Sequence, residues 1–79
     1  MLIYFKEDEI VINTENVSSI EYLTFDDRPC LYFEVNGRMK DVKIFFSTKE
    51  EVFRVLDTIL AAYDNQLKVL LIYDKKLGR

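Results

Sequence analysis

The chain has 79 residues, of which 49% are hydrophobic and 32% are charged, a composition typical of a folded globular chain and not of a disordered one. Its net charge of -3, from 14 acidic and 11 basic residues, disfavours duplex-DNA binding, which usually needs a basic excess. One cysteine cannot form an internal disulfide and fits a reducing compartment, so we expect a cytoplasmic protein. The start of the chain lacks the basic segment and cleavage site of a signal peptide, and no apolar run approaches the roughly 20 residues that cross a bilayer.

This length predicts a single domain over residues 1–79. A chain so short removes only about 60–65% of its unfolded surface from water, and it is therefore marginally stable alone. We expect a subunit interface to contribute to its stability.

Short apolar segments predict three strands at the start of the chain, at residues 2–5, 9–13 and 17–23. Polar turns around residues 6–9 and 14–16 separate them. In the third strand Ile20 and Tyr22 share one face. The segment at residues 24–29 is predicted as the longest loop, because Asp26 and Asp27 favour turns and Pro29 lacks a backbone donor.

Residues 30–36 and 39–46 predict a β-hairpin with two candidate turns. A type I′ turn at Asn36-Gly37 places Arg38 opposite Val35, whereas a type II′ turn at Gly37-Arg38 avoids that clash of polarity. A one-residue slip moves every side chain to the other face, so the apolar pattern decides the register. We favour the Gly37-Arg38 turn, which pairs Phe33 with Val42, Leu31 with Ile44 and Tyr32 with Lys43.

This register sends aromatic side chains to both faces of the sheet. The inward face consists of Leu31, Phe33, Val35, Val42, Ile44 and Phe46. The opposite face carries Tyr32, Glu34, Asp41, Lys43 and Phe45.

Residues 47–63 predict an amphipathic helix that covers the inward face. Ser47 and Glu50 form an S-x-x-E capping box at its start. The centre of the apolar stripe is predicted at Val52, Leu56, Ile59 and Tyr63, flanked by Phe53, Val55 and Leu60.

Residues 67–73, L-K-V-L-L-I-Y, follow a polar interruption and predict a strand; a continuation of the helix is the alternative. In both readings the segment is apolar on both sides. It is therefore the best candidate for a subunit interface. The fold class expected is α+β: an antiparallel five-stranded meander packed by one amphipathic helix, with either an added C-terminal strand or an extended helix.

The sequence offers little of the chemistry that enzymes need. It has no histidine, which removes the usual triads and most zinc sites, and its single cysteine cannot build a thiolate cage. Nucleotide-binding and hydrolase motifs are missing. The paired carboxylates Asp26/Asp27 and Glu50/Glu51 have no contrasting environments, so we predict a non-enzyme without catalytic residues, metal or cofactor.

Some turns and caps in the chain resemble those of small uncharacterised proteins from bacteria and their phages. The matching segments are residues 10–13, 16–20, 36–37 and 46–52, I-V-I-N, N-V-S-S-I, N-G and F-S-T-K-E-E-V. The resemblance implies an architecture similar to pleckstrin-homology-like domains, a strand meander closed by one helix. By analogy it suggests an inhibitor or adaptor of a host protein, but it carries no residue motif.

We therefore expect a small protein-interaction module that forms homo-oligomers and stays off membranes. One alternative is a binder of a nucleotide or anionic metabolite at a subunit interface, with charge supplied by Arg28, Arg38, Arg54 and Lys43. A second is single-stranded nucleic-acid binding, where basic residues (Arg38, Lys40, Lys43 and Lys49) lie among aromatic ones. The candidate binding residues are Tyr4, Tyr32, Lys43, Phe45, Leu67, Val69, Ile72 and Tyr73.

Overall fold

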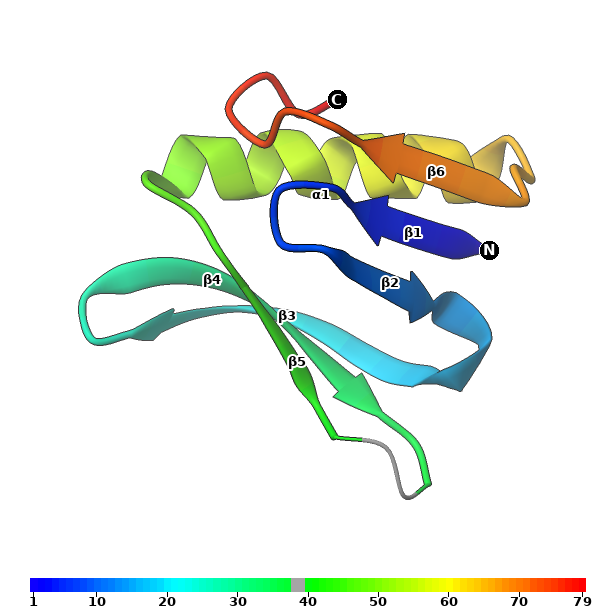
Figure 1. Ribbon diagram of the computed structural model, residues 1–79, viewed down its shortest axis with the longest axis horizontal. Coiled ribbons are helices and arrows are strands. Elements are labelled where there is room, and N and C mark those ends of the chain that lie inside the picture. The colour runs from blue at the N-terminus through cyan, green and yellow to red at the C-terminus, as the bar shows by residue number, and fades with distance from the viewer. Residues whose placement is uncertain (38–39) are drawn as a thin grey trace.

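Two three-stranded sheets and one long helix make up the fold (Figure 1). The computed structural model describes residues 1–37 and 40–79. Sheet A has the strand order β2-β1-β6 and sheet B the order β3-β4-β5. In chain order the elements are β1 (Leu2–Phe5), β2 (Ile10–Asn13), the 3-10 helix η1 (Thr14–Asn16), β3 (Val17–Phe25), β4 (Arg28–Val35), β5 (Val42–Phe45), α1 (Lys49–Asp64) and β6 (Val69–Ile72).

Sheet B is an antiparallel meander of three strands, a part of the five-stranded meander predicted, and it has the favoured register between its last two strands. Phe33 pairs with Val42, Leu31 with Ile44 and Tyr32 with Lys43. Gly37 has a φ of 81°, a left-handed value that suits glycine. The predicted Gly37-Arg38 turn itself includes Arg38, which lies outside the described residues.

The loop predicted at residues 24–29 is wrong. β3 continues to Phe25, β4 begins at Arg28, and these two residues pair directly. The turn is only Asp26-Asp27, with φ values of 51° and 60°. Two positive φ values are what a type I′ hairpin turn requires, and aspartate tolerates this region better than most residues. Pro29 is accommodated inside β4, opposite Thr24.

Sheet A differs from the predicted five-stranded meander. β1 pairs antiparallel with β2, but β2 does not continue into a pairing with β3, because η1 turns the chain into the second sheet. Residues 69–72 form a strand, as the favoured reading of the C-terminal segment expected, and the helix ends at Asp64. β6 pairs with β1 in parallel, since the intervening helix carries the chain back along the molecule (Figure 1).

The N-cap of the helix lies one residue later than the predicted cap, Ser47. Thr48 is the N-cap and accepts a hydrogen bond from the Glu51 amide at 3.2 Å, while the Glu51 carboxylate accepts one from the Ser47 amide at 3.0 Å. The cap therefore uses Thr48 and Glu51, not Ser47 and Glu50, and it is a variant of the capping box because Glu51 reaches back to the amide of Ser47, one residue before the N-cap. Within residues 1–37 and 40–79, no helix has the length and apolar character needed to cross a membrane.

The buried stripe of α1 is also shifted from the prediction. Val52, Val55, Ile59 and Ala62 are buried, Leu56 is half-buried and Tyr63 is 70% exposed. These four packed residues repeat every three or four positions, as one helix face requires. Three of them, Val52, Val55 and Ile59, belong to a core shared by both sheets, formed with Ile3, Phe5, Ile12, Leu31, Phe33, Ile44, Phe46 and Ile72.

Candidate interaction surfaces

The structure divides the eight candidate binding residues between two outer surfaces and the core. Tyr32, Lys43 and Phe45 lie on the outer face of sheet B. Tyr4, Val69 and Tyr73 lie on or beside the outer face of sheet A, and Leu67 is an exposed residue just before β6. Ile72 is completely buried in the core, so it belongs to neither surface.

Aromatic rings on the outer face of sheet B cover one another. Phe25 at the end of β3 lies 6.2 Å from the Tyr32 ring and 6.5 Å from the Phe45 ring. Arg28 lies over Phe45 at 4.2 Å and Lys43 over Phe25 at 4.4 Å, both within cation–π range. The rings are half-buried as a result, and two of the basic groups proposed for nucleic-acid or nucleotide binding, Arg28 and Lys43, already have aromatic partners.

Polar groups on this face are also satisfied internally. The Tyr32 hydroxyl donates a hydrogen bond to Asp41, whose second oxygen accepts one from the Val35 amide at 2.9 Å. The hydrogen bond to Asp41 raises the pKa of Tyr32, and the same bond lowers the pKa of Asp41. Burial beneath the rings raises the pKa of Cys30, as expected for an inert structural thiol.

The outer face of sheet A is different, because its apolar side chains have little cover. The register places Tyr4 between Val11 on β2 and Leu71 on β6, and it places Leu2 beside Val69. These residues and Tyr73, which follows β6, form what we call the sheet A face. Its exposed fractions are 42% for Leu2, 59% for Val11, 52% for Val69, 43% for Leu71 and 52% for Tyr73.

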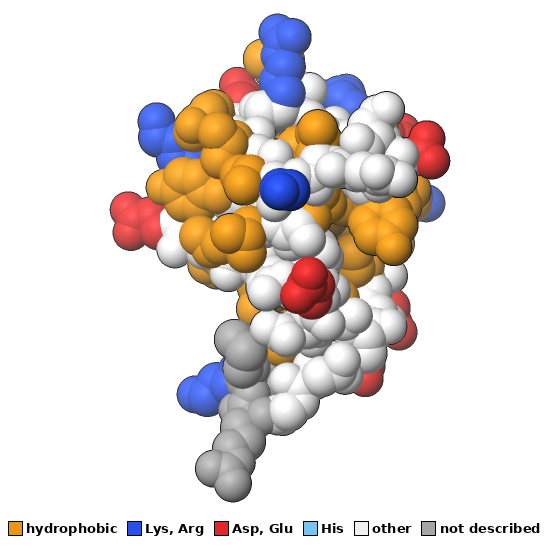
Figure 2. Space-filling view, turned by 90° about the vertical axis from the view of Figure 1, so that its right-hand side faces the viewer, with side chains coloured by type: hydrophobic (Ala, Val, Ile, Leu, Met, Phe, Trp, Pro, Cys, Tyr) orange, Lys and Arg blue, Asp and Glu red, His pale blue; other side chains and the backbone are white. Residues whose placement is uncertain are grey.

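Strand alternation explains how this face arises. In β1, Ile3 and Phe5 point into the core, so Leu2 and Tyr4 must point out. β6 repeats the pattern, with Ile72 inside and Val69 and Leu71 outside. In the space-filling view of the end where these strands begin, hydrophobic side chains gather on two opposite flanks with few charges among them (Figure 2).

Three members of the sheet A face were missed from the sequence: Leu2, Val11 and Leu71. The signal that could have found them is the unbroken run of apolar residues in β1, in β6 and at residues 10–12 of β2, which a strand with one solvated face would not show. Their grouping could not be read from the sequence, because it depends on β6 pairing with a strand almost seventy positions earlier.

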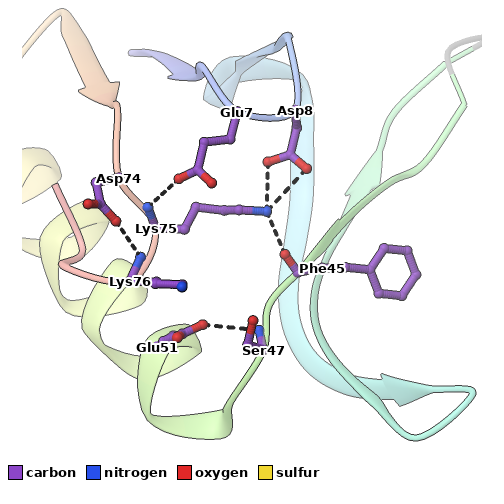
Figure 3. A network of polar contacts seen from close by, with 8 residues as sticks. All are labelled: Glu7, Asp8, Phe45, Ser47, Glu51, Asp74, Lys75 and Lys76. Atoms are coloured by element: carbon purple, nitrogen blue, oxygen red, sulfur yellow. Dashed lines mark hydrogen bonds and ion pairs between the residues drawn. The ribbon is translucent and has the colours of Figure 1, made fainter.

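A polar cluster joins the other ends of the two sheets (Figure 3). The Lys75 ammonium lies 3.0 Å from an Asp8 carboxylate oxygen and donates to the Phe45 carbonyl at 2.6 Å. The Lys75 amide donates to Glu7 at 2.7 Å. Beside them is a cleft of about 370 Å³ whose lining mixes both charge signs, including Glu7, Glu51, Arg28 and Lys76. We interpret the cluster as a structural connection between the two sheets, because its main cation, Lys75, is already paired with Asp8.

The other positions considered for ligand or metal binding give no converging site. Arg54 donates to the Lys76 carbonyl, and Lys49 lies over Tyr22 at 5.6 Å. No group of three or more Cys, Asp or Glu side chains that could hold a metal occurs in residues 1–37 and 40–79. An apolar groove of about 390 Å³ between β3 and α1 is lined in part by Val17, Ile20 and Leu60.

No family model, no curated protein and no solved structure matches this chain. Function is therefore inferred from its surfaces alone.

Proposed function

We propose that this protein is a non-enzymatic protein-interaction module that associates with copies of itself, and that the sheet A face is the contact surface. The observation that carries the proposal is the group of five exposed apolar residues around Tyr4 on one flat face. Apolar surface of this kind is favoured to leave water, and a contiguous patch on a small domain marks an interaction site.

A second copy is the partner that the composition supports. A net charge of only -3 produces little repulsion between copies. A two-fold contact sets the same patch of both chains against each other, which suits a face that is apolar across its centre. Such packing of two sheets face to face, roughly 10 Å apart, is how sheets with apolar faces are commonly buried.

The outer face of sheet B supports the proposal less well. Its rings are half-buried under one another and under Arg28 and Lys43, so a partner would gain less by covering them. The same engagement of the cations argues against the nucleotide and nucleic-acid alternatives.

Size-exclusion chromatography with light scattering tests the proposal. Val11 is exposed on β2, and a Val11→Lys change places a charge on the sheet A face without disturbing the core. We expect wild type to associate at tens of micromolar and Val11→Lys to give a smaller particle, because an ammonium must lose water to enter the contact. Leu60→Lys is the matched control, since Leu60 is 56% exposed on α1 and lies on another surface. A wild-type protein that is strictly monomeric would overturn the proposal.

A further inference from the structure

The free edge of β6 adjoins the sheet A face. The direction of its backbone N–H and C=O groups follows from the hydrogen bonds between this segment and β1. The Leu2 amide donates to the Lys68 carbonyl at 2.9 Å and the Lys6 amide to the Ile72 carbonyl at 3.0 Å. Even-numbered residues of this segment therefore bond to β1. Because backbone groups alternate along a strand, the N–H and C=O groups of Val69 and Leu71 point away from β1, toward the edge of the sheet.

We infer that sheet A continues across this edge into a second copy, through antiparallel pairing of β6 with β6 of the partner chain about a two-fold axis at Leu71. This inference rests on the proposed self-association and adds its geometry. An exposed strand edge is a template for exactly one more strand, and a two-fold axis makes the two templates identical.

Side-chain pattern selects the register. With Leu71 opposite its own copy, Val69 faces Tyr73 on the outer side and Leu70 faces Ile72 on the inner side. The charged ends of the segment then also match, because Lys68 faces Asp74. Opposite charges across an antiparallel pair are favourable and like charges are not.

Two neighbouring registers use the same backbone N–H and C=O groups of β6, but they pair the side chains less favourably. A shift that centres the axis on Leu70 places Lys68 opposite Ile72, which is buried in each chain. A shift that centres it on Ile72 places Asp74 opposite Leu70. Both put a charge against an apolar residue, so the pattern favours the register centred on Leu71.

Edge pairing also enlarges the proposed face contact toward the size of a stable interface. Three strands of four residues cover roughly 14 by 13 Å, or on the order of 200 Å² in plan. A stable interface buries about 800 Å² of accessible surface on each partner. Pairing at β6 doubles the apolar face by placing two copies side by side. Two such dimers then pack face to face, and the expected particle contains four chains.

Disulfide cross-linking tests the register directly, in a Cys30→Ala background that removes the buried native thiol. Residues opposite each other in a hydrogen-bonded pair have Cα atoms about 5.5 Å apart, within disulfide range. Leu71→Cys should therefore form a disulfide-linked dimer on oxidation. Val69→Cys should not link to itself, because its copies lie roughly 13 Å apart in this register. Mixing Val69→Cys with Tyr73→Cys should restore a link.

Charge reversal at the segment ends provides a second test. Lys68→Glu and Asp74→Lys each place like charges opposite each other in a homodimer, and we expect pairing roughly tenfold weaker. A mixture of the two variants restores both opposite-charge pairs, so the heterodimer should form preferentially. Lys76→Glu, a charge reversal outside the pairing, is the control. Asp74 also accepts from the Lys76 amide at 2.9 Å and from the Leu77 amide at 3.3 Å, so each variant is first checked for a wild-type thermal melt.

The outcomes separate this inference from the proposed function. Val11→Lys should stop assembly at two chains that still cross-link through Leu71→Cys, because it disturbs the face and leaves the edge intact. Association in which Leu71→Cys fails to cross-link, or in which Val69→Cys links to itself, would overturn the edge pairing and leave self-association standing. A strict monomer would overturn both.

Discussion

At the scale of single residues, the Lys75 side chain connects parts of the chain that lie far apart in the sequence. Its ammonium pairs with Asp8 in the β1–β2 turn and bonds to the carbonyl of Phe45 in sheet B, and it lies 5.1 Å from the Phe46 ring. The Lys75 and Asp8 side chains are 14% and 23% exposed, so both charges have lost much of their water. The ion pair supplies a partner for an Asp8 carboxylate oxygen that accepts no hydrogen bond from the residues the structure describes.

Lys75→Met should therefore destabilise the fold more than a surface charge deletion does. Removing the cation leaves the Asp8 carboxylate and the Phe45 carbonyl without this partner, and we expect a loss of about 1–3 kcal/mol in the free energy of unfolding. Urea denaturation measures it, with exposed Lys76→Met as the matched control. Adding Asp8→Asn should recover part of the loss, because it removes the stranded charge. Equal stability of Lys75→Met and Lys76→Met would contradict this account.

At the scale of elements, the start of α1 shows how a correct motif can be placed one residue off. The segment S-T-K-E-E contains two overlapping boxes, Ser47 with Glu50 and Thr48 with Glu51. The structure uses the second, and Glu51 is buried as a consequence. Sequence spacing cannot choose between them, because the choice depends on which helix rotation buries Val52, Val55 and Ile59 against both sheets.

Thr48→Ala should cost about 1 kcal/mol of stability, since it removes the oxygen that accepts from the Glu51 amide. Ser47→Ala is the matched control and should change stability little, because the Ser47 contact to Glu51 is made by its backbone. Thermal or urea unfolding of the two variants measures the difference. A larger loss from Ser47→Ala than from Thr48→Ala would restore the cap predicted from the sequence.

Local patterns in the sequence were sufficient for the β4–β5 register, because a slip would have set Arg38 opposite Val35. They failed at Asp26-Asp27, where neither residue is the glycine that marks a tight hairpin and Pro29 suggested a break. The pairing partner of β6 could not be predicted from the sequence, for a different reason. Its apolar residues fit a strand anywhere, and only the path of the whole chain brings it beside β1.

At the scale of the whole molecule, two small sheets share one helix and leave one apolar outer face. The helix fills the inner side of both sheets, and the rings of sheet B shield their own outer side. In the part of the chain that the structure describes, no second helix covers the outer side of sheet A, and the proposed self-association would cover it. The proposed self-association would therefore link folding stability to the association of copies.

That linkage gives a prediction about concentration. Anything that binds only the folded chain stabilises it by mass action, so the wild-type Tm should rise when the protein concentration is raised from about one to one hundred micromolar. The rise in Tm should be smaller for Val11→Lys, which weakens the face contact. For Leu60→Lys the rise in Tm should equal that of the wild type. Differential scanning calorimetry across this range measures it. A wild-type Tm independent of concentration would mean that the sheet A face stays in water in the native state.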